Sequence, residues 1–243
     1  YGARVPFFVS DGLALLNCLY GYFILPESLQ SENRRKFEWS RSNPINSLLN
    51  LRRYPIVLGL VFPNILIMIA GFATQSTWTY YCMDKFSWTE KMVGLSLGFV
   101  GVMAAVVQGG LTRALIPRLG NFRSISFGLL LYSIGFVLYA LANQGWMMFA
   151  ITVIASLGGI AMPALQGVMS NQVPMNEQGE LRGALTSVMS LTSVVGPLIM
   201  TNLFAYFTSA TAPIQLPGAP FWMGALFSQM FTSCMNPSAN NCV

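Results

Sequence analysis

Short charged segments divide the chain into long apolar stretches. No Asp, Glu, Lys or Arg occurs at 54–83, 92–112, 124–176 or 183–243. A bilayer-spanning helix needs about 20 mostly apolar residues, so the first two stretches fit one helix each and the last two fit two each. A further, imperfect apolar stretch lies near the N-terminus. The pattern predicts seven spans, at about 5–25, 55–77, 92–112, 124–142, 146–171, 183–207 and 219–235.

The composition agrees with a chain that lies mostly in a bilayer. Apolar residues make up 54% of the 243 positions and charged residues only 9%, whereas soluble domains carry about 25% charged residues. These values exclude a soluble globular enzyme, a disordered chain and a disulfide-rich secreted domain. They predict the fold class, which is an all-α, polytopic membrane helix bundle.

Lysine and arginine are distributed unevenly between the two sides that the predicted spans define. The segment 26–53 holds six of them and is interpreted as a linker between two bundles. With this linker in the cytoplasm, the inner loops hold ten Lys or Arg and the outer loops hold three, in agreement with the positive-inside rule. Because the basic excess lies in loops beside spans, we expect the lipid bilayer as a partner and no nucleic acid.

The sequence gives no indication of enzyme chemistry. The chain has no histidine, which removes the most common acid–base group and metal ligand. It also lacks a Gly-rich phosphate loop, a metal-ligand cluster and a nucleophile–base pair. We expect a protein that is not an enzyme, with no catalytic residues, metal or cofactor; an intramembrane enzyme is the weakest alternative.

Amide and aromatic side chains inside the predicted spans are candidates for a binding pocket. Polar groups are expensive in a bilayer and are often functional there. Aromatic rings supply contact area and amides fix orientation, which suits a pocket for an amphipathic organic molecule. The alternative for each residue is an ordinary hydrogen bond between helices. The candidate substrate-binding residues are Asn64, Gln75, Trp78, Gln108, Tyr132 and Gln166.

Asp11 is the one carboxylate that lies well inside a predicted span. Burial favours the protonated form of a carboxyl group, so Asp11 is the candidate for proton coupling. In the alternative interpretation Asp11 lies near the outer interface, where water or Arg4 compensates its charge.

Two further features concern helix packing and the last span. Gly94, Gly98 and Gly101 share one face of a predicted helix, and small residues allow membrane helices to approach closely. The last apolar segment is short and polar, so we expect an atypical final helix that is truncated or altered after about Phe227. The first residue, Tyr1, suggests a chain cut on its N-terminal side.

Several motifs resemble the tetracycline-resistance-type drug:proton antiporters of the major facilitator superfamily. The most specific are GGIAMPALQ, EQGEL and SLTSVVGPL, all within 144–201. The segments WTEKMVGLSLGFVGVMAAVVQ and VPFFVSDGLALLN are also similar to that family. The resemblance extends over about 1–227.

The resemblance implies a twelve-helix transporter with its site between two six-helix bundles. Residues 1–25 would be the last helix of the N-terminal bundle, 26–53 the cytoplasmic linker, and 54–243 the C-terminal six-helix bundle. The resemblance also places Tyr132 where related pumps carry an aspartate. The N-terminal bundle is missing from this chain and would be its partner.

The predicted function is therefore secondary active transport. We expect proton-coupled efflux of an amphipathic, plausibly tetracycline-like drug, with the small-molecule substrate and protons as partners. The resemblance implies a bacterial inner membrane as the location. The alternative is a truncated, non-transporting membrane remnant of such a transporter.

Overall fold

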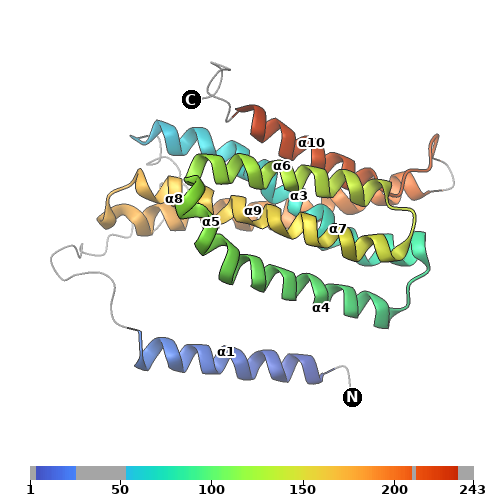
Figure 1. Cartoon of the computed structure of the whole chain (residues 1–243), viewed down its shortest axis with the longest axis horizontal. Helices are drawn as coiled ribbons and strands as arrows, with labels where there is room; N and C mark the ends of the chain where they lie inside the picture. The colour runs from blue at the N-terminus through green and yellow to red at the C-terminus, as the bar shows by residue number, and fades with distance from the viewer. Residues whose placement is uncertain (1–3, 26–52, 210–211, 235–243) are drawn as a thin grey trace. The chain divides into compact units, whose positions relative to one another are not determined.

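The computed structural model describes residues 4–25, 53–209 and 212–234, and all regular elements within them are helices (Figure 1). Five helical segments there are long and apolar enough to cross a membrane. These observations confirm an all-α membrane helix bundle. The chain forms two compact units, 1–37 and 38–243. The first unit contributes α1 (Val5–Phe23), an apolar helix whose described side chains are almost all exposed.

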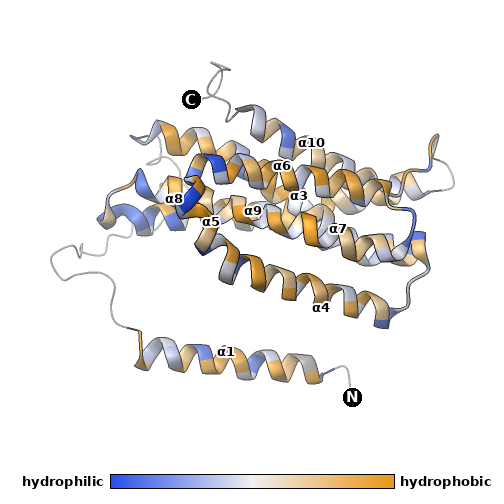
Figure 2. Ribbon diagram, in the orientation of Figure 1, coloured by the Kyte–Doolittle hydropathy of each residue, from blue (hydrophilic) through white to orange (hydrophobic). Residues whose placement is uncertain are grey.

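The second unit is a bundle of helices that pack side by side. They are mostly apolar along their length and hydrophilic at their ends (Figure 2). The contacts of α3 with α9 and α10, and of α6 with α7, α8 and α10, are the most extensive. The helices are α3 (Pro55–Phe86), α4 (Glu90–Val106), α5 (Thr112–Leu119), α6 (Asn121–Leu141), α7 (Gly145–Leu157), α8 (Ala161–Asn171), α9 (Gln178–Thr208) and α10 (Ala219–Cys234).

All seven predicted spans correspond to helices, but three helical segments extend well past the predicted limits. The α4–α5 segment continues seven residues beyond the predicted end at 112, to Leu119. α3 continues nine residues beyond the predicted end at 77, to a C-cap at Ser87 with φ of 51°. Its last turn carries Lys85, whose ammonium donates to the Tyr81 hydroxyl at 2.9 Å. α9 begins five residues before the predicted start at 183. Some charged residues therefore lie within a helix near its end. Spans predicted from stretches without charged residues leave such ends out.

Two of the predicted spans contain a local change of helix type. A π-helical turn at Val107–Leu111 joins α4 to α5, and the Thr112 hydroxyl donates to the Val107 carbonyl, five residues back, at 2.9 Å. A 3₁₀ turn at Gly158–Ile160 joins α7 to α8. The two irregular turns contact each other. Such turns bend membrane helices and often accompany functional sites.

The core of the bundle consists of two apolar clusters. The linker-side cluster surrounds the start of α3 and includes Leu60, Leu165 and Phe231. The far-side cluster surrounds the end of α3 and includes Tyr81 and Phe221, whose rings are 4.8 Å apart. α10 contributes to both clusters, and it continues as a helix past Phe227 to Cys234.

Glycines allow α6 to approach the α7–α8 segment closely. A Cβ atom on Gly128 would lie 2.8 Å from the Ala161 backbone nitrogen, and one on Gly158 would lie 2.8 Å from the Gly128 oxygen. A Cβ on Gly135 would lie 2.7 Å from the Ala155 Cβ. The small residues predicted on α4 differ, because Gly94, Gly98 and Gly101 have no described atom within 4 Å of a built Cβ.

α4 and α9 are the least covered of the long helices. Only 17% of the apolar window in the α4–α5 segment and 22% of that in the α9 segment is buried, against 50% for α6. Large apolar side chains on both helices are exposed, such as Leu95 and Val102 on α4, and Leu191 and Val194 on α9. The open glycine face belongs to this uncovered surface of α4.

We predict that Gly128→Ala destabilises the bundle by about 1–3 kcal/mol, because the added methyl group would overlap the α8 backbone and separate two packed helices. The measurement is thermal unfolding of the full chain in detergent micelles. The control is Gly98→Ala, whose methyl group meets no described atom, and which should leave stability unchanged or slightly raised. Equal effects of the two substitutions would contradict this account of the packing.

Candidate functional site

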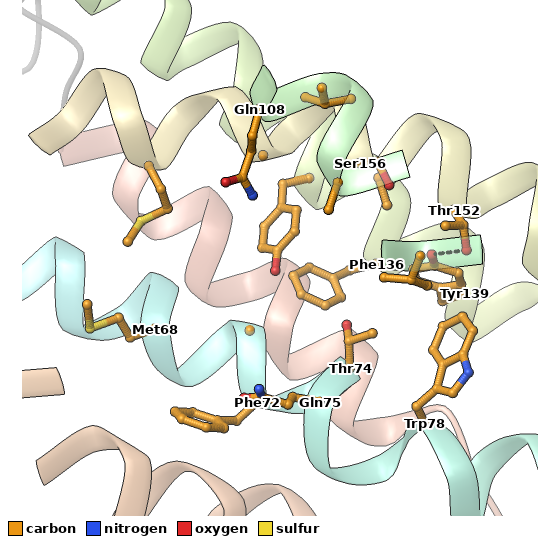
Figure 3. Close-up of a pocket in the computed structure, with 18 of the residues that line it drawn as sticks. Met68, Phe72, Thr74, Gln75, Trp78, Gln108, Phe136, Tyr139, Thr152 and Ser156 are labelled. Atoms are coloured by element: carbon orange, nitrogen blue, oxygen red, sulfur yellow. Dashed lines mark hydrogen bonds between the residues drawn. The ribbon is translucent and has the colours of Figure 1, made fainter. Parts of the chain in front are cut away.

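The second unit contains a partly open cavity of about 520 Å³ between α3, α4, α6, α7 and α9. Its lining is mostly apolar and carries a few polar side chains (Figure 3). A second cavity, of about 410 Å³, extends towards α8. None of the residues that line either cavity is an Asp, Glu, Lys or Arg. The two cavities share Met68, Gly71, Gln108, Tyr132, Gly159 and Met162.

Aromatic side chains form one end of the first cavity, and their polar atoms are already engaged. The Trp78 indole donates to the Ser96 hydroxyl at 3.0 Å, and Ser96 donates to the Val93 carbonyl. The Tyr139 and Thr152 hydroxyls lie 2.8 Å apart (Figure 3). Because Thr152 gives its proton to a backbone carbonyl, Tyr139 is the donor in that pair. This end therefore offers ring surface and no free hydrogen-bonding group from these side chains.

The polar side chains in the middle of the cavities, in contrast, are not engaged in hydrogen bonds. Within the described part of the chain, the side chains of Gln75, Gln108 and Tyr132 make no hydrogen bond. The Tyr132 hydroxyl points towards α3, since it lies 3.7 Å from the position of a Cβ on Gly71. Gln108 belongs to the π turn. These three side chains can bond to a ligand or to water.

The structure brings together five of the six predicted substrate-binding residues. Gln75 and Trp78 line the first cavity, Gln166 lines the second, and Gln108 and Tyr132 line both. Asn64 lines neither cavity. It is 3% exposed and donates to the Met68 sulfur at 4.0 Å, at the level where the linker-side cluster covers its face of α3.

Asp11 belongs to α1, in the other compact unit, and its side chain is exposed there. The linker predicted at 26–53 lies outside the described residues except for its last residue, Arg53.

Several cavity residues were missed by the sequence analysis. Phe136 and Tyr139 follow Tyr132 at intervals of four and three residues, so the three side chains share one face of α6. Thr152 and Ser156 have a similar spacing on α7. These spacings were visible in the sequence, but they are equally typical of an ordinary helix–helix contact.

A hydrogen bond joins the N-terminal ends of α3 and α9. The Tyr54 hydroxyl, at the N-cap of α3, donates to the Glu177 carboxylate at 2.6 Å. This bond, with burial as the second cause, raises the pKa of Tyr54 above its usual range. The contact connects the start of α3 to the segment that precedes α9.

We predict that Tyr54→Phe lowers the free energy of unfolding by about 0.5–1.5 kcal/mol near neutral pH, because one hydrogen bond is lost. A raised folded-state pKa means that the neutral phenol stabilises the fold. The contribution is therefore complete below about pH 10 and is lost as the pH rises through the raised pKa. Unfolding of both proteins across this pH range measures the difference.

The control for this prediction is Tyr80→Phe, at an exposed position on α3. It should change stability little at any pH. A Tyr54→Phe effect that persists unchanged well above pH 10 would contradict the assignment to the phenol proton.

The fold and the cavity define a class: a polytopic membrane helix bundle with a partly open, mostly apolar pocket that carries a few free polar groups. The family model of the Major Facilitator Superfamily matches residues 1–197 and 66–235. The chain belongs to the Major Facilitator Superfamily, and it is an integral membrane protein of that transporter family.

Individual relatives agree with this assignment. The class C tetracycline resistance protein of Escherichia coli is 37% identical over 202 residues, which are 83% of this chain and 51% of that protein. The class G protein of Vibrio anguillarum is 44% identical over 147 residues, or 60% of this chain and 36% of that protein. The human hippocampus abundant transcript-like protein 1 is 24% identical over 93% of this chain and 48% of its own length. The chain thus spans about half the length of such relatives.

Proposed function

We propose that this chain supplies one wall of the substrate cavity in a proton-coupled exporter of amphipathic, tetracycline-like drugs. The single observation that carries the proposal is the large, uncharged cavity with an aromatic end and unbonded amide and hydroxyl groups. Pockets for drug-sized molecules have this composition. The names of the class C and class G relatives support tetracycline as the first compound to test. Their bacterial sources support a bacterial inner membrane as the location.

The cavity requires a second wall. It is partly open, and its lining includes residues of α4 and α9, which are the least covered long helices of the unit. We propose that a first bundle of six helices covers these two faces, and that the drug binds between the bundles. The open glycines on α4, such as Gly98, would allow a helix of the first bundle to approach closely.

Proton coupling needs an ionisable group, and no Asp or Glu lines the cavity. Tyr132 can donate and accept hydrogen bonds but is neutral at physiological pH. We therefore propose Asp11 on α1, together with groups of the first bundle, as the site of proton exchange. In this proposal the cavity described here binds the drug and does not itself carry the proton.

We predict that the chain alone exports no tetracycline, and that co-expression with the first five spans of the class C relative restores energy-dependent export, because residues 1–25 would supply the sixth. Drug accumulation in intact cells measures both results. Gly98→Leu should abolish the restored export, because its side chain would fill the space needed by the partner helix. Leu130→Phe, at an exposed position on α6, is the control and should leave export intact. Strong export by the chain alone would refute the need for a second bundle.

The second prediction concerns Tyr132, which the resemblance places where related pumps have an acid. In the restored transporter, Tyr132→Asp should alter the pH dependence of export or the range of drugs exported more than it alters folding. Tyr132→Phe is the matched control, because it removes the hydroxyl without adding an ionisable group. Normal insertion of the Asp variant with an unchanged pH profile and drug range would show that the position is structural.

A further inference from the structure

A cation from a neighbouring helix holds one wall residue of the second cavity. Gln166 lies on α8 and lines that cavity, and Arg182 lies in the second turn of α9. The Arg182 guanidinium donates to the Gln166 side-chain oxygen, with a distance of 2.9 Å from Nη1 to Oε1. Gln166 is half-buried, whereas Arg182 is exposed.

The chemistry of the two groups determines which way the carboxamide faces. A guanidinium has only N–H donors, so it must bond to the oxygen of an amide and not to its nitrogen. The oxygen and nitrogen of a carboxamide lie in one plane, on opposite sides of the Cγ–Cδ bond axis. With Oε1 turned to Arg182, the NH₂ group is turned away from it. Among the described residues, that NH₂ group has no hydrogen-bond partner.

The surroundings of this NH₂ group favour a ligand that presents a hydrogen-bond acceptor to it. Apart from Gln166, the wall that the second cavity does not share with the first is apolar, and includes Ile67, Leu129 and Pro163. A donor left unbonded beside a bound ligand costs binding free energy, whereas an acceptor on the ligand recovers it. The Tyr132 hydroxyl and the Gln108 amide, on the shared wall, can bond to further polar atoms of the same ligand.

We propose that Arg182 is a positioning residue that fixes the Gln166 NH₂ group towards the second cavity, so that this end of the cavity recognises an acceptor oxygen of the drug. The ligand class is a planar, aromatic molecule with a carbonyl or phenolate oxygen on one edge. Its rings lie towards Trp78 and Tyr139, and its oxygen-bearing edge lies towards Gln166. This inference rests on the proposed drug-binding function of the cavity.

The test uses three tricyclic probes of nearly equal size and shape. Fluorenone carries a carbonyl acceptor, carbazole carries an N–H donor, and fluorene carries neither. The chain is co-expressed with the first five spans of the class C relative, and equilibrium binding of each probe to this complex in lipid nanodiscs is measured, with empty nanodiscs subtracted. We expect the wild-type chain to bind fluorenone about three- to tenfold more tightly than fluorene, as one added hydrogen bond would produce.

Four variants separate orientation from simple packing. Gln166→Met should abolish the preference for fluorenone, because it removes the donor. Arg182→Glu should reverse the preference towards carbazole, since a carboxylate accepts from the NH₂ group and turns the amide oxygen to the cavity. Arg182→Lys keeps a donor and should keep the fluorenone preference. Arg123→Glu, at an exposed position at the start of α6, makes the same charge change away from the cavity and should leave the preference unchanged.

The binding results test the role of Arg182 and the proposed drug cavity separately. Equal binding of the three probes by the wild-type chain overturns this inference and leaves the proposed drug cavity standing. A wild-type chain that binds none of them overturns the drug cavity itself, and the inference with it. A fluorenone preference that survives both Gln166→Met and Arg182→Glu shows that Arg182 only packs α8 against α9. If Arg182→Glu fails to fold in thermal unfolding, the comparison of Arg182→Lys with Gln166→Met decides.

Discussion

The close approach of α6 to the α7–α8 segment is the packing constraint on which the cavity depends. Apolar side chains gain little from association in lipid, so membrane helices adhere through van der Waals contact between surfaces that fit closely. Gly128, Gly135 and Gly158 supply that surface, and a side chain on any of them would overlap the opposite helix. Tyr132 and Tyr139 alternate with the α6 glycines on the same helix face, and together with Phe136 they line the first cavity beside this contact. The helix contact thus creates one wall of the pocket.

The two irregular turns belong to the same arrangement. The 3₁₀ turn beginning at Gly158 narrows α7–α8 at the point of contact, and Gly159, with open space where its Cβ would be, lines both cavities. The π turn facing it widens α4–α5 and carries Gln108 into both cavities. In this π turn the Val107 carbonyl accepts the backbone N–H of Thr112, five residues on, and it also accepts the Thr112 hydroxyl. The π turn thus places the Gln108 amide in the pocket, and the 3₁₀ turn leaves space there at Gly159.

The sequence was sufficient to predict the helices but not the depth at which each polar side chain lies. The spacing of Asn64, Gln75 and Trp78 puts all three side chains on one face of α3. It could not show that the linker-side cluster covers this face one turn below Met68. Helix ends were underestimated for a similar reason. Lys85 lies inside α3 although the charge-free stretch ends at 83, and Glu180 lies inside α9 although the charge-free stretch begins at 183. The role of Arg182 was also out of reach, because it depends on a contact between α8 and α9.

Hydrogen-bonded and free polar atoms are distributed unevenly along the cavity, and this favours one orientation of a bound ligand. At the far-side end, the Trp78 and Tyr139 polar atoms are bonded within the bundle, so their rings offer only apolar and quadrupolar surface. Towards the linker side, amide and hydroxyl groups are free to bond. A molecule whose polar edge faces the Trp78 and Tyr139 rings would find no free donor on these two side chains, and it would leave the Gln166 NH₂ group unbonded. Both costs fall on the reversed orientation, so the pocket selects how a ligand lies even though no charged residue lines it.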